Sequence, residues 1–376
     1  MADNMSKITA VLVLGVMILF GAFFAFGNKK DFSENENREL AETPDISLSD
    51  AVDGKFAKNT EKYFTDHFPF RDRFIAGSAK LSTLVSESIV NGVYVSGDRL
   101  LDVSAEERDA TDKSAELINN FCKDHSSAAY FVCVPTSSGV YGDEIPPYYK
   151  KNIENRQITS LYNSLSADIR RIDAYNILKM LNENYIYYKN DNKWTTYGAY
   201  CVYKTVIQKL GFSPIPYSKY TVEHVDFDFR GNLYDITQYK DIAPDTIDIY
   251  KCLSSVKIKS CISYDNNGKR EKLNLCDKER LDSAYKYDVY LGETKPYLNI
   301  KTTVNNNRKL LVIKDRFGDC FIPFLTQHYS EIAVVSPEEL NVPLSSIVNV
   351  DSYEQTLFIM GINSMSNSEL FELLNK

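Results

Sequence analysis

From residue 105 onward, apolar runs of strand length alternate with stretches of helical periodicity, and this alternation constrains the fold more than any other feature. Strand patterns occupy residues 129–134, 310–315, 332–335 and 356–361. Helical patterns occupy residues 105–123, 157–170 and 196–210. Strands that alternate with helices predict a mostly parallel sheet with helices on both faces, so the expected fold class is α/β.

Shorter elements complete the expected order. Residues 92–101 predict a hairpin with its turn at Gly97-Asp98. Residues 185–188 predict an aromatic strand that leads toward the 196–210 helix. A short helix is expected to begin at residue 172, and another is expected around residues 317–329.

Residues 215–300 interrupt the alternation. They contain β-prone runs at 247–250, 256–262 and 287–291. These runs predict either an antiparallel insertion or strands that extend the sheet. Alternation then resumes, and the last expected helix ends at Leu374, with Ser366 and Glu369 spaced as a capping box at its start.

An uncharged apolar segment, residues 8–26, lies near the start of the sequence. As a helix it would be roughly 28 Å long, which matches the hydrocarbon core of a bilayer. No clear small-x-small cleavage site follows it, so we interpret it as an uncleaved signal-anchor. Lys7 flanks one end and Lys29 and Lys30 the other, so the positive-inside rule does not favour an exported body. Residues 28–48 are polar and predict a linker.

Charge and cysteine content argue against several classes of function. The formal net charge of −8, without a run of basic residues, argues against nucleic acid or an anionic membrane face as the main partner. The chain has no CxxC pair and no Cys/His pattern typical of zinc, so we expect neither a metal nor a cofactor. Of seven cysteines, Cys133 and Cys201 are expected to be buried thiols, whereas Cys252 and Cys261 could bridge in an exported protein.

A polar cluster, Asp191-Asn192-Lys193-Trp194, separates the expected aromatic strand from the helix that follows. It contains the only tryptophan of the chain. Open α/β sheets place their chemistry where a strand ends before a helix. This cluster is therefore the first candidate site.

Several motifs, taken in order, resemble the DHHW protein family of Gram-positive bacteria, which is similar to the SGNH-hydrolase-like alginate O-acetylation proteins. The motifs are Glu36-Asn37-Arg38, the block from Asp66 to Asp72, Asn91-Gly92-Val93-Tyr94, Val134-Pro135-Thr136, Asp191-Asn192-Lys193-Trp194, and Lys314-Asp315 leading into Pro323-Phe324-Leu325. The resemblance implies an SGNH-hydrolase-like three-layer sandwich with a β-rich insertion and an N-terminal transmembrane helix. The expected organisation is a cytoplasmic tail at 1–7, a signal-anchor at 8–27, a linker at 28–48 and an extracytoplasmic domain at 49–376.

In active relatives, the aspartate and the second histidine of the family motif form two thirds of a Ser-His-Asp triad. The corresponding residues here are Asp191 and Lys193, and an already protonated lysine cannot replace the imidazole base. Where relatives carry the serine after a strand that ends in Lys-Asp, this chain has Arg316, which has no nucleophilic oxygen. The oxyanion-supporting Gly-Gly-Asn becomes Gly292-Glu293-Thr294. Together these departures predict a pseudoenzyme.

Two states of the altered site are expected from these residues. Asp191 and Arg316 could form a bidentate pair that seals the site. Alternatively, Lys193 and Arg316 beside Trp194 would favour an anionic sugar or phosphate. Ligand-binding candidates are Trp194, Asn192, Tyr94, Thr136 and Ser137.

A substitute nucleophile is also conceivable at Ser137, Ser138 or Cys320. The serines follow a predicted strand and the cysteine lies one helical turn beyond Arg316. A structural role, with the serines capping a turn and the cysteine packed in the core, is the more common state of such residues.

The resemblance implies a membrane-bound, single-pass protein whose main domain lies outside the cytoplasm. Such proteins work with membrane-bound O-acyltransferases that acetylate cell-surface polysaccharide. We therefore expect a catalytically inactive protein that binds the polysaccharide or organises the acyltransferase. One alternative is an active polysaccharide O-acetyltransferase or acetylesterase with a non-standard nucleophile, and another is a structural envelope protein.

Overall fold

The computed structural model describes residues 2–26, 29–33, 38–44, 55–84, 89–103, 111–148 and 153–376. Two compact units form: a small unit of Met1–Asn91 with Tyr234–Asp241, and a large unit of Gly92–Leu233 with Ile242–Lys376. Outside the described residues lie parts of the expected 28–48 linker, the start of the 105–123 helix, and Glu36-Asn37. The division into 1–7, 8–27, 28–48 and 49–376 stays a prediction.

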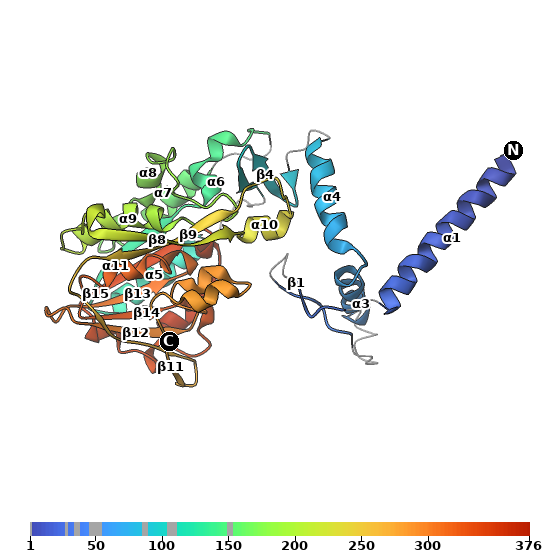
Figure 1. Cartoon of the computed structure of the whole chain (residues 1–376). Helices are drawn as coiled ribbons and strands as arrows, with labels where there is room; N and C mark the ends of the chain where they lie inside the picture. The colour runs from blue at the N-terminus through green and yellow to red at the C-terminus, as the bar shows by residue number, and fades with distance from the viewer. Residues whose placement is uncertain are drawn as a thin grey trace. The chain divides into compact units, whose positions relative to one another are not determined.

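An eight-stranded sheet organises the large unit (Figure 1). Its strands are β6 (Ala128–Val134), β7 (Arg170–Ile172), β10 (Ile258–Tyr264), β11 (Arg270–Lys272), β12 (Tyr297–Thr302), β13 (Lys309–Lys314), β14 (Glu331–Val335) and β15 (Gln355–Gly361). The spatial order is β11-β10-β12-β14-β13-β15-β6-β7. Strands from β14 to β7 pair in parallel, and β12, β10 and β11 continue the sheet antiparallel. The expected mostly parallel α/β sheet is confirmed.

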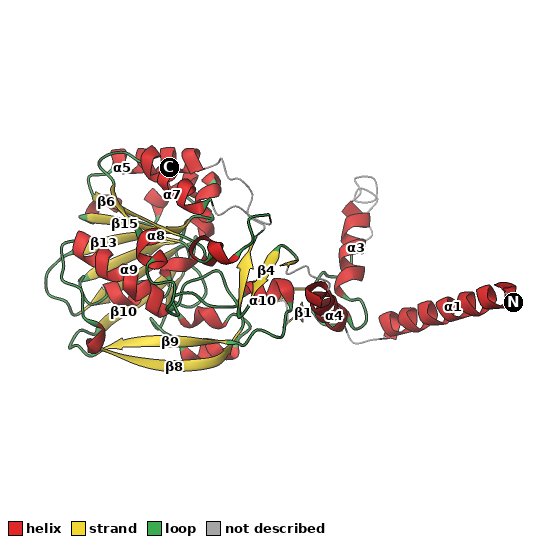
Figure 2. Cartoon of the chain, turned by 90° about the horizontal axis from the view of Figure 1, so that it is seen from above, coloured by secondary structure: helices red, strands yellow, loops and turns green. Residues whose placement is uncertain are grey.

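Alternate residues of the parallel strands enter two separate apolar cores. The main covering helices are α5 (Thr111–Asp124), α7 (Glu154–Ser164), α8 (Ala174–Lys179) and α9 (Thr196–Lys209). Val132 and Val312 lie in one core with residues of α8 and α9, whereas Phe131 and Leu311 lie in the other with α5 and α7. Because both faces of these strands are buried, their sequences are near-continuous apolar runs. Helix, sheet and helix thus form three layers (Figure 2).

The region 215–300 combines both arrangements that the sequence left open. β8 (Tyr220–Phe229) and β9 (Asp245–Cys252) form a separate antiparallel ribbon, whereas β10, β11 and β12 extend the main sheet. The run at 287–291 is not a strand, because Lys286–Val289 forms a 3-10 helix. The predicted hairpin at 92–101 is confirmed as β4 (Val93–Ser96) and β5 (Arg99–Asp102).

Several expected elements differ in the structure. Residues 185–188 join no sheet, because the run pairs with the segment just after it: Tyr188 N donates to Lys193 O at 3.2 Å and Thr195 N donates to Ile186 O at 2.9 Å. The helix expected at 157–170 ends at Ser164, and the chain enters β7 instead.

Two expected helices are replaced by shorter turns. The region around 317–329 holds only a 3-10 turn, Arg316–Gly318, and the short helix α11 (Ile322–Leu325). At the C-terminal end, Ser368–Asn375 is a 3-10 helix capped by Asn367 rather than by Ser366.

The small unit includes a long apolar helix. Its elements are α1 (Ala2–Phe26), β1 (Phe32–Ser33), β2 (Arg38–Glu39), α3 (Lys55–Asp66), α4 (Arg71–Leu84) and β3 (Ile89–Val90). Among the described residues, α1 is the one helix that is long and apolar enough to cross a membrane, with a mean hydropathy of 2.3 over Lys7–Phe24. By length and composition, α1 fits either a membrane anchor or a signal sequence.

Two short helices remain to be placed in the element order. They are α6 (Ser137–Val140) and α10 (Asn232–Thr237).

Candidate functional site

The polar cluster lies on a tight loop that enters α9. Tyr187 and Trp194 face each other in an isolated antiparallel bridge, and Thr195 N donates to Ile186 O at 2.9 Å. The Thr195 hydroxyl then caps α9 by accepting from Gly198 N at 3.2 Å. Glycine is required at 198 because a Cβ there would lie 2.3 Å from Ile186 O. The loop therefore closes on itself, with the polar cluster at its tip.

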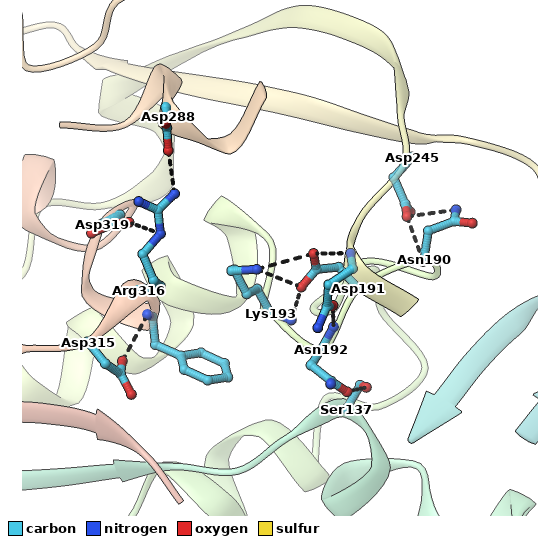
Figure 3. Close-up of polar contacts among 12 residues, drawn as sticks. Ser137, Asn190, Asp191, Asn192, Lys193, Asp245, Asp288, Asp315, Arg316 and Asp319 are labelled. Carbon is cyan, nitrogen blue, oxygen red and sulfur yellow. Dashed lines mark hydrogen bonds and ion pairs between the residues drawn. The ribbon is translucent and has the colours of Figure 1, made fainter. Parts of the chain in front are cut away.

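The carboxylate of Asp191 is fully engaged at this tip (Figure 3). Lys193 approaches it twice, with Nζ at 3.1 and 3.2 Å from the two oxygens and the backbone N–H at 2.8 Å. Asn232 N donates to it at 3.0 Å. A Cβ on Gly231 would come within 2.3 Å of the Asp191 side chain. Asp191 is only 2 % exposed, so its charge is balanced within the protein.

Arg316 lies in the turn after β13 and binds a different set of partners. Its Nη2 donates to Asp288 Oδ1 at 2.5 Å, its Nη1 to Thr294 Oγ1 at 2.6 Å, and its Nε lies 3.1 Å from Asp319 Oδ2. Figure 3 shows Arg316 and Lys193 directed at separate carboxylates. The expected bidentate pair between Asp191 and Arg316 is therefore wrong, because other carboxylates lie closer to the guanidinium.

Charges around Arg316 form a partly buried network. Burial lowers the pKa of Arg316, but the Asp319 and Asp288 carboxylates outweigh it and raise the pKa above its usual value. Burial raises the pKa of Asp288, and the guanidinium offsets part of that rise. Asp319 also accepts a hydrogen bond from Lys314, and both of these side chains are almost fully buried. The position where the resemblance predicts a serine thus holds a permanently charged group.

Tyr287 connects the two cationic positions. Lys193 Nζ lies 5.2 Å and Arg316 Cζ 5.7 Å from the centroid of its ring, within the range of cation–π attraction. Burial raises the pKa of Tyr287 well above its usual value, so its phenol stays neutral. Tyr287 and Asp288 were not predicted as site residues, since both belong to a 3-10 helix in a run that was expected to be a strand. Asp319, three residues after Arg316, could have been found from that spacing.

Asp315 joins the ends of two neighbouring strands. It accepts hydrogen bonds from Phe317 N at 2.9 Å, Gly361 N at 2.6 Å and Ser364 Oγ at 2.6 Å. Burial raises the pKa of this carboxyl, and these three donors lower it in part. Asp315 therefore fixes the turn that carries Arg316.

The ligand-binding candidates divide by exposure. Trp194 is 0 % exposed, and its indole donates to Phe317 O, so direct ligand contact by Trp194 is contradicted. Thr136 and Ser137 are also buried; Thr136 caps α6, and Ser137 Oγ donates to Asn192 Oδ1 at 3.3 Å. Asn192 and Tyr94 keep partial exposure, and their ligand-binding role stays a prediction.

The region expected to support an oxyanion lines a very small pocket. Gly292, Glu293 and Thr294 surround it together with Lys314 and Asp319, and its volume is about 10 Å³, room for about one water molecule. Glu293 pairs with Lys295 at 2.7 Å. The vestigial oxyanion role of this region remains a prediction.

The substitute nucleophiles lack an activating base among the described residues. Burial raises the pKa of Cys320 to about 12, so it stays a thiol at neutral pH. Ser138 Oγ is buried without a hydrogen-bond partner. His125 and His224 pair with Asp351 and Asp248. Likewise, no group of three or more His, Cys, Asp and Glu side chains in the described part of the chain is arranged to hold a metal ion.

His328 is buried beside Tyr203. The Tyr203 hydroxyl lies 2.7 Å from His328 Nε2. Burial lowers the pKa of this histidine to about 4, so its ring is neutral at physiological pH. Its hydrogen-bonding and ring contacts involve Tyr203, Phe212 and Asn306, which supports a structural role.

Solved structures share this architecture. A DHHW family protein from Eubacterium siraeum aligns with 22% identity over 76% of this chain and 96% of its own, with a TM-score of 0.65. Bacillus cereus PatB1 aligns with 17% identity over 75% of this chain and 99% of its own, with a TM-score of 0.64. PatB1 with a sulfonyl adduct gives 16% identity and a TM-score of 0.63, over 75% and 98% of the two chains. No curated protein sequence matches significantly.

A mostly parallel sheet between two helical layers, with Asp315 and Arg316 at the carboxyl end of β13, makes this chain an α/β protein that shares the fold of these solved structures. The family assignment is narrower. The model of the DHHW protein family matches residues 80–335. This match covers more than half of the sequence, and the chain belongs to the DHHW family.

Proposed function

We propose that this DHHW protein assists the O-acetylation of cell-surface polysaccharide without carrying out acetyl transfer by the family triad. The observation that carries the proposal is Arg316 at the expected serine position, bound to Asp288, Asp319 and Thr294. A guanidinium held by two carboxylates has no nucleophilic oxygen to offer an acetyl group.

The expected base position supports the same proposal. Lys193 is bound through its ammonium group to both oxygens of Asp191. A general base must take a proton from the nucleophile at neutral pH, and an ammonium ion paired with a carboxylate cannot do so. The charge arrangement therefore favours an inactive site over an altered but working triad.

The proposed place of action is the outer face of the cytoplasmic membrane. In this proposal α1 is a retained anchor, which its apolar window at Lys7–Phe24 allows. By resemblance to the family, the partners would be a membrane-bound O-acyltransferase and its polysaccharide. Asn192 and Tyr94, which keep partial exposure, are the proposed contacts to the polysaccharide.

Acetyl-ester hydrolysis by the full chain in detergent tests the inactive state. The natural protein is expected to show no hydrolysis above a detergent blank. The Lys193→His, Arg316→Ser double variant would restore the missing groups, and Lys113→His, Arg156→Ser, on helices away from the site, is the matched control. Turnover by the natural protein would contradict the proposal and would make Ser137 the next residue to replace.

Polysaccharide retention tests the binding part separately. The full chain is passed over immobilised cell-surface polysaccharide in its acetylated and deacetylated forms. Retention of the natural protein and loss of retention for Asn192→Ala would support the glycan contact. Equal behaviour of Asn192→Ala and the natural protein would remove Asn192 from the proposed contacts.

A further inference from the structure

Four phenylalanines in the small unit are exposed to an unusual degree for large apolar side chains. Phe64, Phe68, Phe70 and Phe74 are 52 %, 46 %, 47 % and 54 % exposed. With Ile75 and other neighbours, three of them line an apolar cleft of about 490 Å³. Clustered exposed aromatic side chains mark interaction surfaces rather than ordinary protein surface.

The same rings contact the end of the candidate membrane helix. Phe68 stacks on Phe20 at 5.4 Å between ring centroids, and Phe64 stacks on Phe24 at 4.7 Å. Phe70 meets Phe23 edge-on at 5.3 Å. Phe20, Phe23 and Phe24 lie in the last turns of the apolar window Lys7–Phe24. The exposed rings therefore continue the apolar surface of α1 at the end where it would leave a bilayer.

Cationic side chains surround this aromatic group. Lys29, Lys30, Arg71 and Arg73 line a cavity of about 390 Å³ together with Phe23, Phe24, Phe68, Phe70 and two acidic residues. Of those acids, Asp66 already accepts from Ala41 N at 2.9 Å and lies 4.0 Å from Arg71. Lys29 Nζ lies 5.1 Å from the Phe24 ring centroid. Cations therefore outnumber carboxylates around this cavity.

The turn that carries Phe70 is unusual in its backbone. Phe70 has φ of +60°, the left-handed conformation that bulky residues rarely adopt. Strained backbone of this kind is kept where the surrounding structure requires it, and it is often found at functional sites. Here it occurs between α3 and α4, within the exposed aromatic group.

We propose that Phe64, Phe68, Phe70 and Phe74, with the four cations Lys29, Lys30, Arg71 and Arg73, form a surface that docks on the lipid bilayer beside α1. The rings enter the boundary between acyl chains and headgroups, where aromatic side chains are favoured. The cations bind headgroup phosphates, and anionic lipid strengthens the contact. This inference depends on the proposal that α1 is a membrane anchor. The docking surface adds a second membrane contact, which restrains the chain where it leaves the bilayer.

A lipid surface fits these observations better than a protein partner. The apolar rings continue the surface of the candidate membrane helix, and a band of positive charge lies next to them. A bilayer leaflet has the same order, with acyl chains followed by phosphates. The ring contacts to Phe20, Phe23 and Phe24 place both groups at one depth.

Quenching by brominated lipid tests the proposal on the full chain. Phe68→Trp is reconstituted in vesicles of phosphatidylcholine and phosphatidylglycerol whose acyl chains are brominated near the headgroup end. Its added emission is expected to fall roughly twofold, as for a ring at the acyl boundary. Phe227→Trp, at a residue of the large unit that is 68 % exposed, is the matched control and should keep its emission. The buried Trp194 contributes the same background to each protein.

A third probe separates this inference from the anchor itself. Leu14→Trp lies within the candidate membrane span and reports whether α1 is inserted. Quenching at both positions 14 and 68 supports the anchor and the docking surface. Quenching at 14 without quenching at 68 overturns the docking surface and leaves that face for solvent or a protein. Absence of quenching at both positions overturns both proposals.

The lipid preference gives a second readout. Brominated phosphatidylglycerol, diluted in unlabelled phosphatidylcholine, should quench Phe68→Trp more than brominated phosphatidylcholine at the same fraction. Adding Lys30→Gln and Arg73→Gln should remove this difference, whereas Lys113→Gln and Lys204→Gln in the large unit should preserve it. Equal quenching by both lipids in the parent variant would contradict headgroup binding by the cations.

Discussion

The indole N–H of Trp194 donates a hydrogen bond to the carbonyl oxygen of Phe317 at 2.9 Å. This bond joins the loop before α9 to the turn after β13, and therefore links the two segments that carry Lys193 and Arg316. Trp194 thus holds together the two segments of the candidate site.

Trp194 should report its own burial in solution. As the only tryptophan and a fully buried one, it is expected to emit at short wavelength, to resist quenching by acrylamide, and to shift to long wavelength on unfolding. Trp194→Phe should cost roughly 1–3 kcal/mol, because the Phe317 carbonyl loses its buried donor. Denaturant unfolding of natural and variant proteins measures this cost. A long-wavelength, easily quenched native emission would contradict the buried position.

Asp319 is expected to be the most sensitive member of the charge network. Asp319→Asn leaves Lys314 without its buried carboxylate and weakens the Arg316 contact. Removing one partner of a buried pair typically costs about 3–5 kcal/mol. The partly exposed pair Lys295–Glu293 supplies the control, since Glu293→Gln should cost less than about 1 kcal/mol. Similar unfolding midpoints for the two variants would show that the network is not strongly coupled.

The sequence predicted the central sheet because its strands are buried on both faces. Such strands are continuous apolar runs that can be recognised without knowing which strands they pair with. They are β6, β13, β14 and β15. The aromatic run 185–188 also predicts a strand, yet it forms one side of a tight loop because its backbone groups bond to residues 193 and 195 just after it. Strand propensity does not show whether a run joins a sheet or folds back on its own neighbours.

The residues of the candidate site stay a prediction, and the sequence did not predict which of their side chains pair. Asp191, Lys193 and Arg316 were identified by their place in the family motifs, yet the partners of Arg316 come from other segments, with Asp288 in a turn expected to be a strand. Which carboxylate binds which cation depends on distances of a few ångströms that sequence spacing leaves open.

His328 should make stability depend on pH. Its pKa in the folded protein is lowered to about 4 from 6.5 by burial, so the unfolded chain binds its proton more readily. The folded state is therefore favoured above about pH 6.5, and on the order of 2–3 kcal/mol is lost as pH falls toward 4. Urea unfolding at pH 7.5 and near 4.5 should show this loss. In His328→Gln the loss should shrink, and an unchanged pH dependence would assign the effect to other groups.

Gly231 should be required for the position of Asp191. A Cβ at 231 would lie 2.3 Å from the Asp191 side chain, so Gly231→Ala is expected to displace that carboxylate at a cost of roughly 1–3 kcal/mol. In an Asp191→Ala background the same substitution should cost much less, because the clash is gone. A double-mutant cycle from unfolding free energies measures this coupling. Additive costs would show that the two residues do not meet.

The pairing of β6 with β15 has a consequence for the order in which this protein is built. Ala128 at the start of β6 is in register with Gln355 at the start of β15, so the middle of the sheet cannot close until nearly the whole chain has been synthesised. Until then the apolar edge of β6 has no partner on that side. Contacts so distant in sequence fold slowly and leave strands open to aggregation, so β6 stays exposed to wrong pairing until β15 has been made.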